Sequence, residues 1–505
     1  MRLRQRIQTL LLAGGLACLG CRGDASTEID LGADMMSMPP DGGNWLPPSI
    51  VPGAIDRILL RGVMLTPGGP LRGELLIEGT NITCVAQSCS SLPAASGATV
   101  ISTSGVIMPG MLDGHNHGLF NIFDEADWSP GRFYGSHNDW TSDVRYQQVL
   151  DAKQYLNKDV TSPVDLRCEI DKYAEIKALI AGTTSFTLAP GAVELACYES
   201  LARTIDTSRN DLGVDRLRTA ISVPTATSAQ TICNAFTAGT ANAYAVHVAE
   251  GINATARNEF ATLESRANGC LLAPQTAIVH GTALGTPEFS KMGIAGMKLI
   301  WSPKSNLFLY NDTTRIDLAM MAGVNTIALA PDWSLGGSVN LLDELKVARQ
   351  VSESKFNGLL APRRLFEMVT VDAARALGVD AALGTLEVGK RADLVLFRGD
   401  AEQPYDALLS ASPLDLELVM VDGRALYGTL ELKAAASPTP GCEEISLCGT
   451  TKFLCVAESS TANKLNQTYA EIVGVLTSNL TSYDTMSSAM GVAPVSPIAP
   501  LLKCP

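Results

Sequence analysis

Between about residue 108 and residue 378 the chain alternates stretches of helical period with short apolar runs rich in β-branched residues. Residues 167–182 have the period of a helix that stops at Gly182, and residues 183–188 follow as a strand. The same strand character returns in four later runs, at residues 243–249, 276–281, 296–303 and 325–333. Repeated β/α units build a parallel sheet flanked by helices, so we expect an α/β fold with a (β/α)8 TIM barrel over residues 108–378.

Only seven strands of this barrel can be located from the sequence, counting from the segment that ends at His115. The run 194–205 has helical period, and residues 217–223 are again typical of a strand. One β/α unit between residues 189 and 244 is therefore expected to be shortened or hidden.

Short β-rich runs lie on both sides of the barrel segment. Three precede it, at residues 56–66, 73–85 and 98–108, and two follow it, at residues 384–400 and 413–428. We expect residues 56–107 and 379–433 to form one small β domain built from both ends of the chain. Residues 434–505 begin with a Pro-containing linker and are predicted to be a separate appendage with four cysteines: Cys442, Cys448, Cys455 and Cys504.

The N-terminus has three arginines, a short apolar run and then cysteine, which is typical of a secretory signal rather than a membrane span. Residues 1–20 are the predicted signal peptide. The pattern resembles a bacterial lipoprotein signal with Cys21 as the lipidated residue and Cys18 as the alternative. Residues 21–55 are expected to be a flexible tether. We expect a protein of the cell envelope, lipid-anchored, with the outer membrane as the first choice, or secreted.

The net charge of −14 argues against a nucleic-acid partner or an anionic membrane surface, because either would need a basic face. We therefore expect a small-molecule substrate and membrane contact by the lipid anchor only, and the sequence leaves the oligomeric state open. Outside Cys18 and Cys21 ten cysteines remain, an even number that indicates disulfides in an exported chain. Cys84 and Cys89 are close enough to close a small loop, and the other pairings stay open.

Four of the five histidines lie at predicted strand ends. His115 and His117 flank Asn116 on an extended segment, so both side chains point to the same side and can reach one ion. His247 and His280 end two later strands, and Asp332 ends another; the carboxyl ends of barrel strands meet at one rim. Imidazoles with one carboxylate suit a single divalent ion, with zinc as the first choice and iron as the alternative.

Such an ion lowers the pKa of bound water, so the site also needs groups that move protons. Glu250 lies three residues after His247, where its carboxylate can turn back over the metal site. His137 and Trp140 lie in the long aromatic loop after the first strand and are candidates for substrate binding. Ser305 and Asn306, in the stretch 302–310, are further candidates for hydrogen bonds to substrate.

The motifs in this order resemble the amidohydrolase superfamily, and within it the deaminase/chlorohydrolase group that uses one metal ion. The resemblance covers residues 56–430 through VIMPGMLDGHNHG, ALIAGTTSF, VHVAEG, AIVHG, SPKSNLFL, ALAPDWSLGG and LGTLEVGKRADLVLF. It implies a metal-centred barrel with a composite β-sandwich. It also implies roles: His115, His117, His247 and Asp332 hold the metal, His280 orients or polarises, Asp332 accepts the proton of water, and Glu250 carries it to the leaving group.

The sequence therefore predicts a metal-dependent hydrolase of a C–N bond other than a peptide bond, in an amide, cyclic amide or amino-heterocycle. One alternative is a binuclear member with a carboxylated lysine, as in cyclic amidases or dipeptidases. No lysine occurs between Lys177 and Lys291, and neither of these two is at the right place, which argues against it. The other alternative is a non-catalytic envelope binding protein on the same fold. The substrate, the leaving group and the identity of the metal stay open.

Overall fold

A computed structural model describes residues 45–158, 162–187, 197, 201–207, 212, 217–436, 441–459 and 464–504. The chain divides into two compact units, residues 1–36 and residues 37–505, and every described residue belongs to the second. The predicted signal peptide 1–20, Cys18, Cys21 and the tether up to residue 44 lie outside the described residues.

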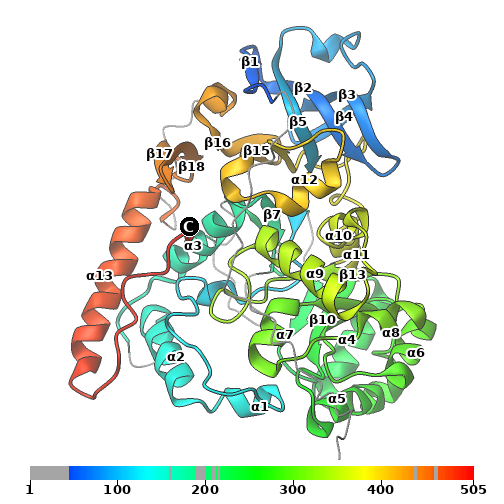
Figure 1. Ribbon diagram of the computed structural model, residues 1–505, viewed down its shortest axis with the longest axis vertical. Coiled ribbons are helices and arrows are strands. Elements are labelled where there is room, and N and C mark those ends of the chain that lie inside the picture. The colour runs from blue at the N-terminus through cyan, green and yellow to red at the C-terminus, as the bar shows by residue number, and fades with distance from the viewer. Residues whose placement is uncertain are drawn as a thin grey trace, which may run out of the picture. The chain divides into compact units, whose positions relative to one another are not determined.

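The two ends of the described chain form one mixed β-sheet, as the sequence predicts (Figure 1). Met108 of β5 pairs with Val395 of β14 in antiparallel register, and this contact joins the N-terminal strands to the C-terminal ones. The sheet is continuous through β5 and β14, so the described strands form one sheet where a sandwich of two was expected. Its members are β1 (Ser49–Val51), β2 (Ala54–Thr66), β3 (Gly69–Glu78), β4 (Asn81–Ala86), β5 (Ala98–Pro109), β14 (Leu394–Phe397), β15 (Leu416–Val421), β16 (Arg424–Thr429), β17 (Cys442–Leu447) and β18 (Thr450–Cys455).

Two expected boundaries are wrong. The flexible tether was predicted to reach residue 55, but residues 49–51 form β1, which pairs antiparallel with β5. The C-terminal extension was predicted to be separate, but β18 pairs with β16, with Leu454 opposite Tyr427. Phe453 and Leu454 are buried there. Burial of these apolar side chains stabilises the packing of the extension against the sheet. Helix α13 (Tyr469–Ser488) then packs against α2 (Val144–Leu156) and α3 (Arg167–Leu179).

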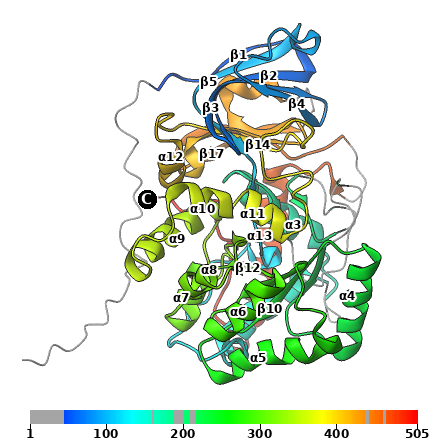
Figure 2. The same cartoon turned by 90° about the vertical axis from the view of Figure 1, so that its right-hand side faces the viewer.

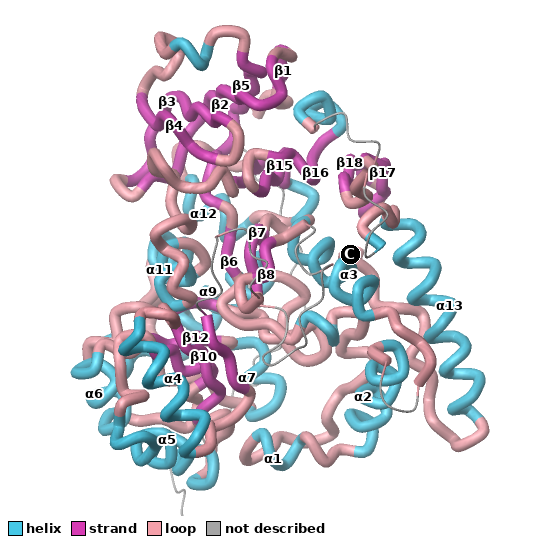
Figure 3. Tube along the Cα trace, turned by 180° about the vertical axis from the view of Figure 1, so that it is seen from behind, coloured by secondary structure: helices cyan, strands magenta, loops and turns pink. Residues whose placement is uncertain are grey.

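The described residues of the barrel segment contain eight short strands in two parallel sheets. Figure 3 shows the first sheet, β6 (Met111–Leu112), β7 (Thr183–Phe186) and β8 (Arg203–Thr204). The second has the order β13-β12-β11-β10-β9 and comprises β9 (Leu217–Ala220), β10 (Ala243–Val248), β11 (Thr276–His280), β12 (Lys298–Trp301) and β13 (Ile327–Leu329). A parallel bridge between Asn116 and Asp332 links the two sheets on one side. On the other side, β8 and β9 do not pair within the described residues.

Strand β8 is the one that the sequence pattern hid. It falls in the run 194–205, for which helical period predicted a helix, and this prediction is wrong at Arg203 and Thr204. A strand of two residues is too short to show an alternating pattern. Tertiary contacts hold it in place instead, because the Arg203 guanidinium forms a buried ion pair with Asp393, which precedes β14.

Helices follow most of the strands, and Figure 2 shows α4, α5 and α6 beside β10 and β12. Local signals set their ends: the Thr225 side chain accepts a hydrogen bond from Ser228 N at the start of α4, and Gly239 ends it in the left-handed region. The helices are α1 (His137–Trp140), α4 (Ala226–Ala238), α5 (Ala254–Ser265), α6 (Thr286–Ala295), α7 (Pro303–Tyr310), α8 (Ile316–Met321), α9 (Leu341–Lys355), α10 (Pro362–Met368), α11 (Val371–Ala376) and α12 (Pro404–Ser410). None of those described has the length and apolar character needed to cross a bilayer.

All ten cysteines beyond Cys21 form disulfides, which confirms the prediction from their even number. Cys84 pairs with Cys89, as expected from their spacing. The other four pairs are Cys168–Cys197, Cys233–Cys270, Cys442–Cys455 and Cys448–Cys504.

The Cys448–Cys504 disulfide should stabilise the fold more than the Cys84–Cys89 disulfide. Its sequence separation is 56 residues against 5, so it removes more conformational freedom from the unfolded chain. We expect replacement of Cys448 and Cys504 by Ser to lower the free energy of unfolding by about 4 kcal/mol, against about 2 kcal/mol for the Cys84 and Cys89 pair. Urea unfolding of both double variants measures the difference, and equal losses would contradict this ordering.

Candidate metal centre

The HxH segment is held beside Asp332 by hydrogen bonds on both sides. After β6, the Asp113 carboxylate accepts hydrogen bonds from His115 N (3.0 Å) and from the Asn116 amide (2.6 Å). On the other side, His117 N donates to Asp332 O (2.6 Å), and Asp332 N donates to His115 O (3.2 Å). The segment therefore runs alongside the end of β13, with the His115 side chain buried.

Four side chains from four strand ends converge at this point. The nitrogen or oxygen ligand atoms of His115, His247, His280 and Asp332 all lie within 4.8 Å of one another, whereas the ligand set expected from the sequence has His117 in place of His280. His117 lies beside this group, with Nε2 3.5 Å from Asp332 Oδ1. His280 and Asp332 both have positive φ angles, 65° and 72°, which residues with side chains rarely adopt. Strained backbone of this kind gathers at functional sites.

The imidazoles of His247 and His280 have their second ring nitrogens engaged. His247 Nδ1 lies 3.1 Å from the carbonyl oxygen of Ala220, and His280 Nδ1 lies 3.2 Å from Asn306 Oδ1. Because both partners are acceptors, each Nδ1 carries the proton, and each Nε2 keeps a lone pair for the centre of the group. The Asn306 amide in turn donates to Thr314 Oγ1 (3.2 Å), which fixes its oxygen toward His280. Partners of this kind orient the histidines of metal sites.

The electrostatics of the group also suit a cation. Burial lowers the pKa of His117 to about 3 and holds the pKa of His247 well below its usual value. Burial acts to raise the pKa of Asp332, but the hydrogen bond from His115 and the surrounding imidazoles hold it below its usual range. At neutral pH His117 and His247 are therefore neutral and Asp332 is ionised. These are the protonation states that bind a divalent ion. These donors fit zinc, for which nitrogen and carboxylate ligands are usual.

The comparisons agree with this geometry. Residues 106–426 match the model of the amidohydrolase family, which is more than half of the chain. The chain belongs to the amidohydrolase family. It is a metal-dependent hydrolase of C–N bonds other than peptide bonds.

Similar proteins match either most of this amidohydrolase or a shorter part of it. The 5'-deoxyadenosine deaminase of Methanothermobacter thermautotrophicus is 24% identical over 415 residues, which are 75% of this chain and 95% of that enzyme. Human guanine deaminase is 30% identical over 151 residues, 29% of this chain and 31% of that enzyme. Among solved structures, a mutant atrazine chlorohydrolase from Arthrobacter aurescens TC1 in complex with zinc and atraton has a TM-score of 0.58 at 19% identity, covering 73% of this chain and 95% of that one.

Beside the metal group of this amidohydrolase lies Glu250, which follows β10. Its Oε2 is 3.8 Å from His280 Nε2, and its part in proton transfer stays a prediction. Its Oε1 accepts a hydrogen bond from the Tyr310 hydroxyl (2.7 Å), and that hydroxyl accepts one from Trp140 Nε1 (2.9 Å). Sequence reasoning missed Tyr310. It ends the same SPKSNLFLY stretch that supplied Ser305 and Asn306, but only tertiary packing brings it to Glu250.

Three of the four predicted substrate-binding residues, Ser305, Asn306 and Trp140, have side chains in contact with other residues of the site. Ser305 donates to Asp332 Oδ2 (2.6 Å), and Asn306 holds His280 as described above. Trp140 contacts Tyr310 and lies next to the ring of Trp333, with the two ring centroids 5.4 Å apart. His137 Nε2 lies 2.7 Å from Glu259 Oε1 on α5, and this hydrogen bond raises the pKa of His137.

Replacement of Tyr310 by Phe should lower kcat by about 10- to 100-fold with little change in KM, because it removes a hydrogen bond to a charged carboxylate that moves protons. The ring and its packing remain, so bound metal should stay at the wild-type level. Tyr244→Phe is the matched control, since the buried Tyr244 hydroxyl has no hydrogen-bond partner among the described residues. A Tyr310→Phe variant that changes KM alone, or one that behaves like Tyr244→Phe, would show that Tyr310 does not position Glu250.

Proposed function

We propose that this amidohydrolase is a deaminase of an amino-substituted heteroaromatic ring and that it uses one zinc ion. One observation carries the proposal: Glu250 stands 3.8 Å from His280 at the edge of a compact group of histidines and one aspartate. That arrangement supplies metal ligands and a separate proton carrier. The relatives named as deaminases of 5'-deoxyadenosine and guanine support the amino-heterocycle as substrate.

In the proposed reaction water replaces the exocyclic amino group, which leaves as ammonia. When bound, the divalent ion polarises the attacking water and lowers its pKa. His115, His117, His247 and Asp332 are the proposed ligands, and Ser305 holds Asp332 by its hydrogen bond. Asp332 takes the proton of the water, His280 orients or polarises the reacting group, and Glu250 delivers a proton to the leaving nitrogen.

One metal ion per chain is part of the proposal. A carboxylated lysine between two ions has no candidate at the carboxyl ends of the described strands of the two parallel sheets: the one lysine in these strands, Lys298, begins β12 and donates to Arg375 O. Lys177 lies in α3 and donates to Asn121 O (2.7 Å), and Lys291 lies in α6 and pairs with Glu264. The strand order and the Asn116–Asp332 bridge support a closed (β/α)8 barrel around this single site.

The deciding experiment measures ammonia and metal together. The zinc-loaded chain from residue 21 onward is incubated with adenine nucleosides, guanine, amino-triazines and, for comparison, amides, hydantoins and lactams. We expect ammonia from at least one amino-heterocycle, about one zinc per chain, and loss of activity on chelation that zinc restores. Ring opening of a cyclic amide with two metals per chain would favour the binuclear alternative. No product from any compound would favour a non-catalytic envelope protein.

We also propose that the protein is anchored in the cell envelope through a lipid on Cys21. The five disulfides support an oxidising compartment outside the cytoplasm. Replacement of Cys21 by Ser should move the protein from the membrane fraction to the soluble fraction, while Cys18→Ser should not. The reverse result would assign the lipid to Cys18.

A further inference from the structure

Lys153 brings a positive charge to the edge of the metal centre. It lies on α2, and its Nζ stands 4.8 Å from the centre of the Phe120 ring. Phe120 ends a short 3-10 helix, Gly118–Phe120, that begins directly after His117. The Phe120 ring also lies beside the ring of Trp333, with the two centroids 5.4 Å apart, and Trp333 directly follows Asp332. The lysine therefore belongs to the surroundings of the active site.

This cation has no partner of opposite charge. Within the described part of the chain, the Lys153 ammonium makes no ion pair and donates no hydrogen bond to a side chain or carbonyl. Burial alone lowers its pKa, to about 8, and no neighbouring carboxylate offsets this effect. By contrast, Lys304, which is also near the site, pairs with Glu125 at 3.0 Å. Taking a charge out of water without a partner is costly, which argues that Lys153 is kept for a ligand.

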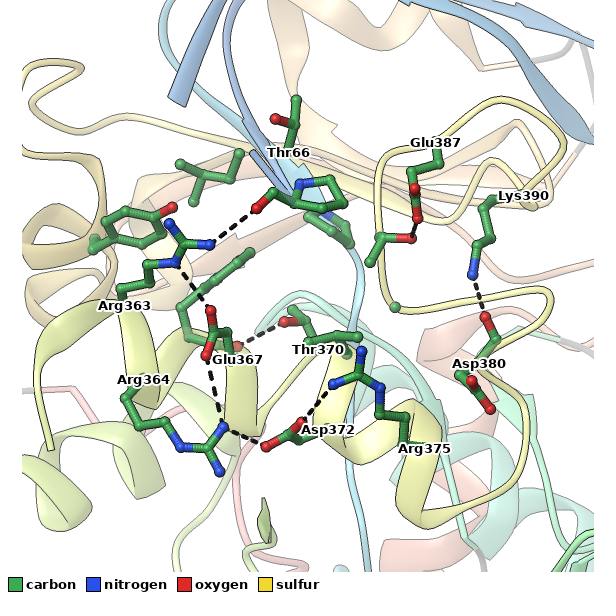
Figure 4. Close-up of a pocket in the computed structure, with 18 of the residues that line it drawn as sticks. Thr66, Arg363, Arg364, Glu367, Thr370, Asp372, Arg375, Asp380, Glu387 and Lys390 are labelled. Carbon is green, nitrogen blue, oxygen red and sulfur yellow. Dashed lines mark hydrogen bonds and ion pairs between the residues drawn. The ribbon is translucent and has the colours of Figure 1, made fainter. Parts of the chain in front are cut away.

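The other cluster of basic side chains does not share this property. It lines a cleft of about 490 Å³ between the β2–β3 turn and helices α10 and α11 (Figure 4). There Arg363 pairs with Glu367, and Arg364 and Arg375 both pair with Asp372. These cations are already neutralised within the chain, so the cleft has no unpaired positive charge among these arginines. Lys153 is thus the better site for an anion.

A second donor lies on the same helix, two turns before Lys153. The Tyr146 ring stacks on Phe120 with ring centroids 6.3 Å apart, so Phe120 contacts both side chains. The Tyr146 hydroxyl makes no hydrogen bond within the described residues. The Tyr146 ring also lies beside the rings of Trp140 and Trp333, with centroids 5.0 Å and 6.0 Å apart. Burial raises the pKa of Tyr146 to about 12, so its hydroxyl keeps its proton. Helix α2 therefore presents one cation and one neutral donor near the metal centre.

We propose that Lys153 binds an anionic substituent of the substrate, a carboxylate or a phosphate, with the Tyr146 hydroxyl as a second donor. The proposal rests on the proposed deaminase function and narrows its substrates to amino-heterocycles that carry a negative group away from the C–N bond. A neutral nucleoside would leave the half-buried ammonium without a partner. The chain as a whole has a net charge of −14 and repels anions. An unpaired lysine at this position provides a local positive charge that attracts them.

The first test measures binding and needs no turnover. Benzoate, phenyl phosphate and neutral benzamide are titrated into the zinc-loaded chain, with the fluorescence of the tryptophans around the site as the signal. We expect at least one anion to bind about 10- to 100-fold more tightly than benzamide, and Lys153→Met to abolish that preference. Lys153→Arg should retain part of it. Lys158→Met is the matched control, because Lys158 lies just beyond α2 and already pairs with Asp165.

Each result decides for or against the anion site. A preference for benzoate or phenyl phosphate identifies the anionic group as carboxylate or phosphate. No preference for either anion, or a preference that survives Lys153→Met because the anion binds the zinc itself, would overturn the proposal. Ammonia release separates the two proposals: an anion preference that depends on Lys153 without any ammonia leaves the anion site standing and removes the deaminase. If the wild type and Lys153→Met release ammonia equally fast, both from a substrate that carries a carboxylate and from its carboxamide, the deaminase function stands and the anion site is removed.

Discussion

Replacement of Glu250 by Gln should lower kcat by roughly 10²- to 10⁴-fold, the range that a positioned proton carrier contributes. Gln keeps the size of the side chain and can still bond to the Tyr310 hydroxyl, which sits 2.7 Å from Oε1 in the wild type. It has no carboxylate to take up and deliver a proton. Because the histidines and Asp332 stay in place, bound zinc should remain at the wild-type level. Steady-state kinetics and metal analysis on the same preparation measure both quantities.

Glu264→Gln is the control for this result. Glu264 lies near the end of α5 and forms an ion pair with Lys291. Its replacement therefore changes the charge of the protein without changing the site. A Glu250→Gln enzyme with wild-type kcat would remove Glu250 from the proton path. A variant that loses zinc would instead show that Glu250 holds the metal.

The strand-end positions of the site were predictable because each depends on a local pattern. His247 and His280 end runs of Val, Ile and Ala that are long enough to identify a buried strand. Once the runs are assigned to one parallel arrangement, their carboxyl ends must meet at one rim. The same logic fails at β8, where Arg203 and Thr204 carry no strand pattern.

The contacts around these ligands were not predictable from the sequence, because they join residues far apart in the chain. Tyr310 and Glu250 are separated by 60 positions, and Lys153 reaches Phe120 through the packing of α2. Ser305 and Asn306 were expected to bind substrate because of their motif. The structure places Ser305 against Asp332 and Asn306 against His280, where their hydrogen bonds orient these two side chains, and contact with substrate stays a prediction. The prediction of a separate C-terminal appendage was wrong for the same reason. The pairing of β18 with β16 joins strands whose contact cannot be deduced from either segment alone.

Asp332→Asn should cause a loss at least as large as that of Glu250→Gln, because two functions depend on this one carboxylate. Asp332 Oδ1 lies 3.1 Å from His115 Nε2 and 3.5 Å from His117 Nε2, and Oδ2 accepts from Ser305. Asn preserves this shape but removes the negative charge that holds a divalent ion and the group that takes up a proton. We expect zinc content to fall well below one per chain and kcat to fall by about 10³-fold or more, even when excess zinc refills the site.

The refilling step separates the two functions of Asp332. If excess zinc restored both occupancy and kcat, the carboxylate would be a ligand only, and proton acceptance would pass to Glu250 alone. Asp317→Asn is the control, because Asp317 pairs with Arg315 at the start of α8 and its loss should leave zinc content and kcat unchanged. The double variant of Asp332→Asn with Glu250→Gln gives the final comparison. If Asp332 and Glu250 act on the same proton, the loss of kcat in the double variant should be far smaller than the product of the two single losses. If they act in independent steps, the two fold-losses should multiply.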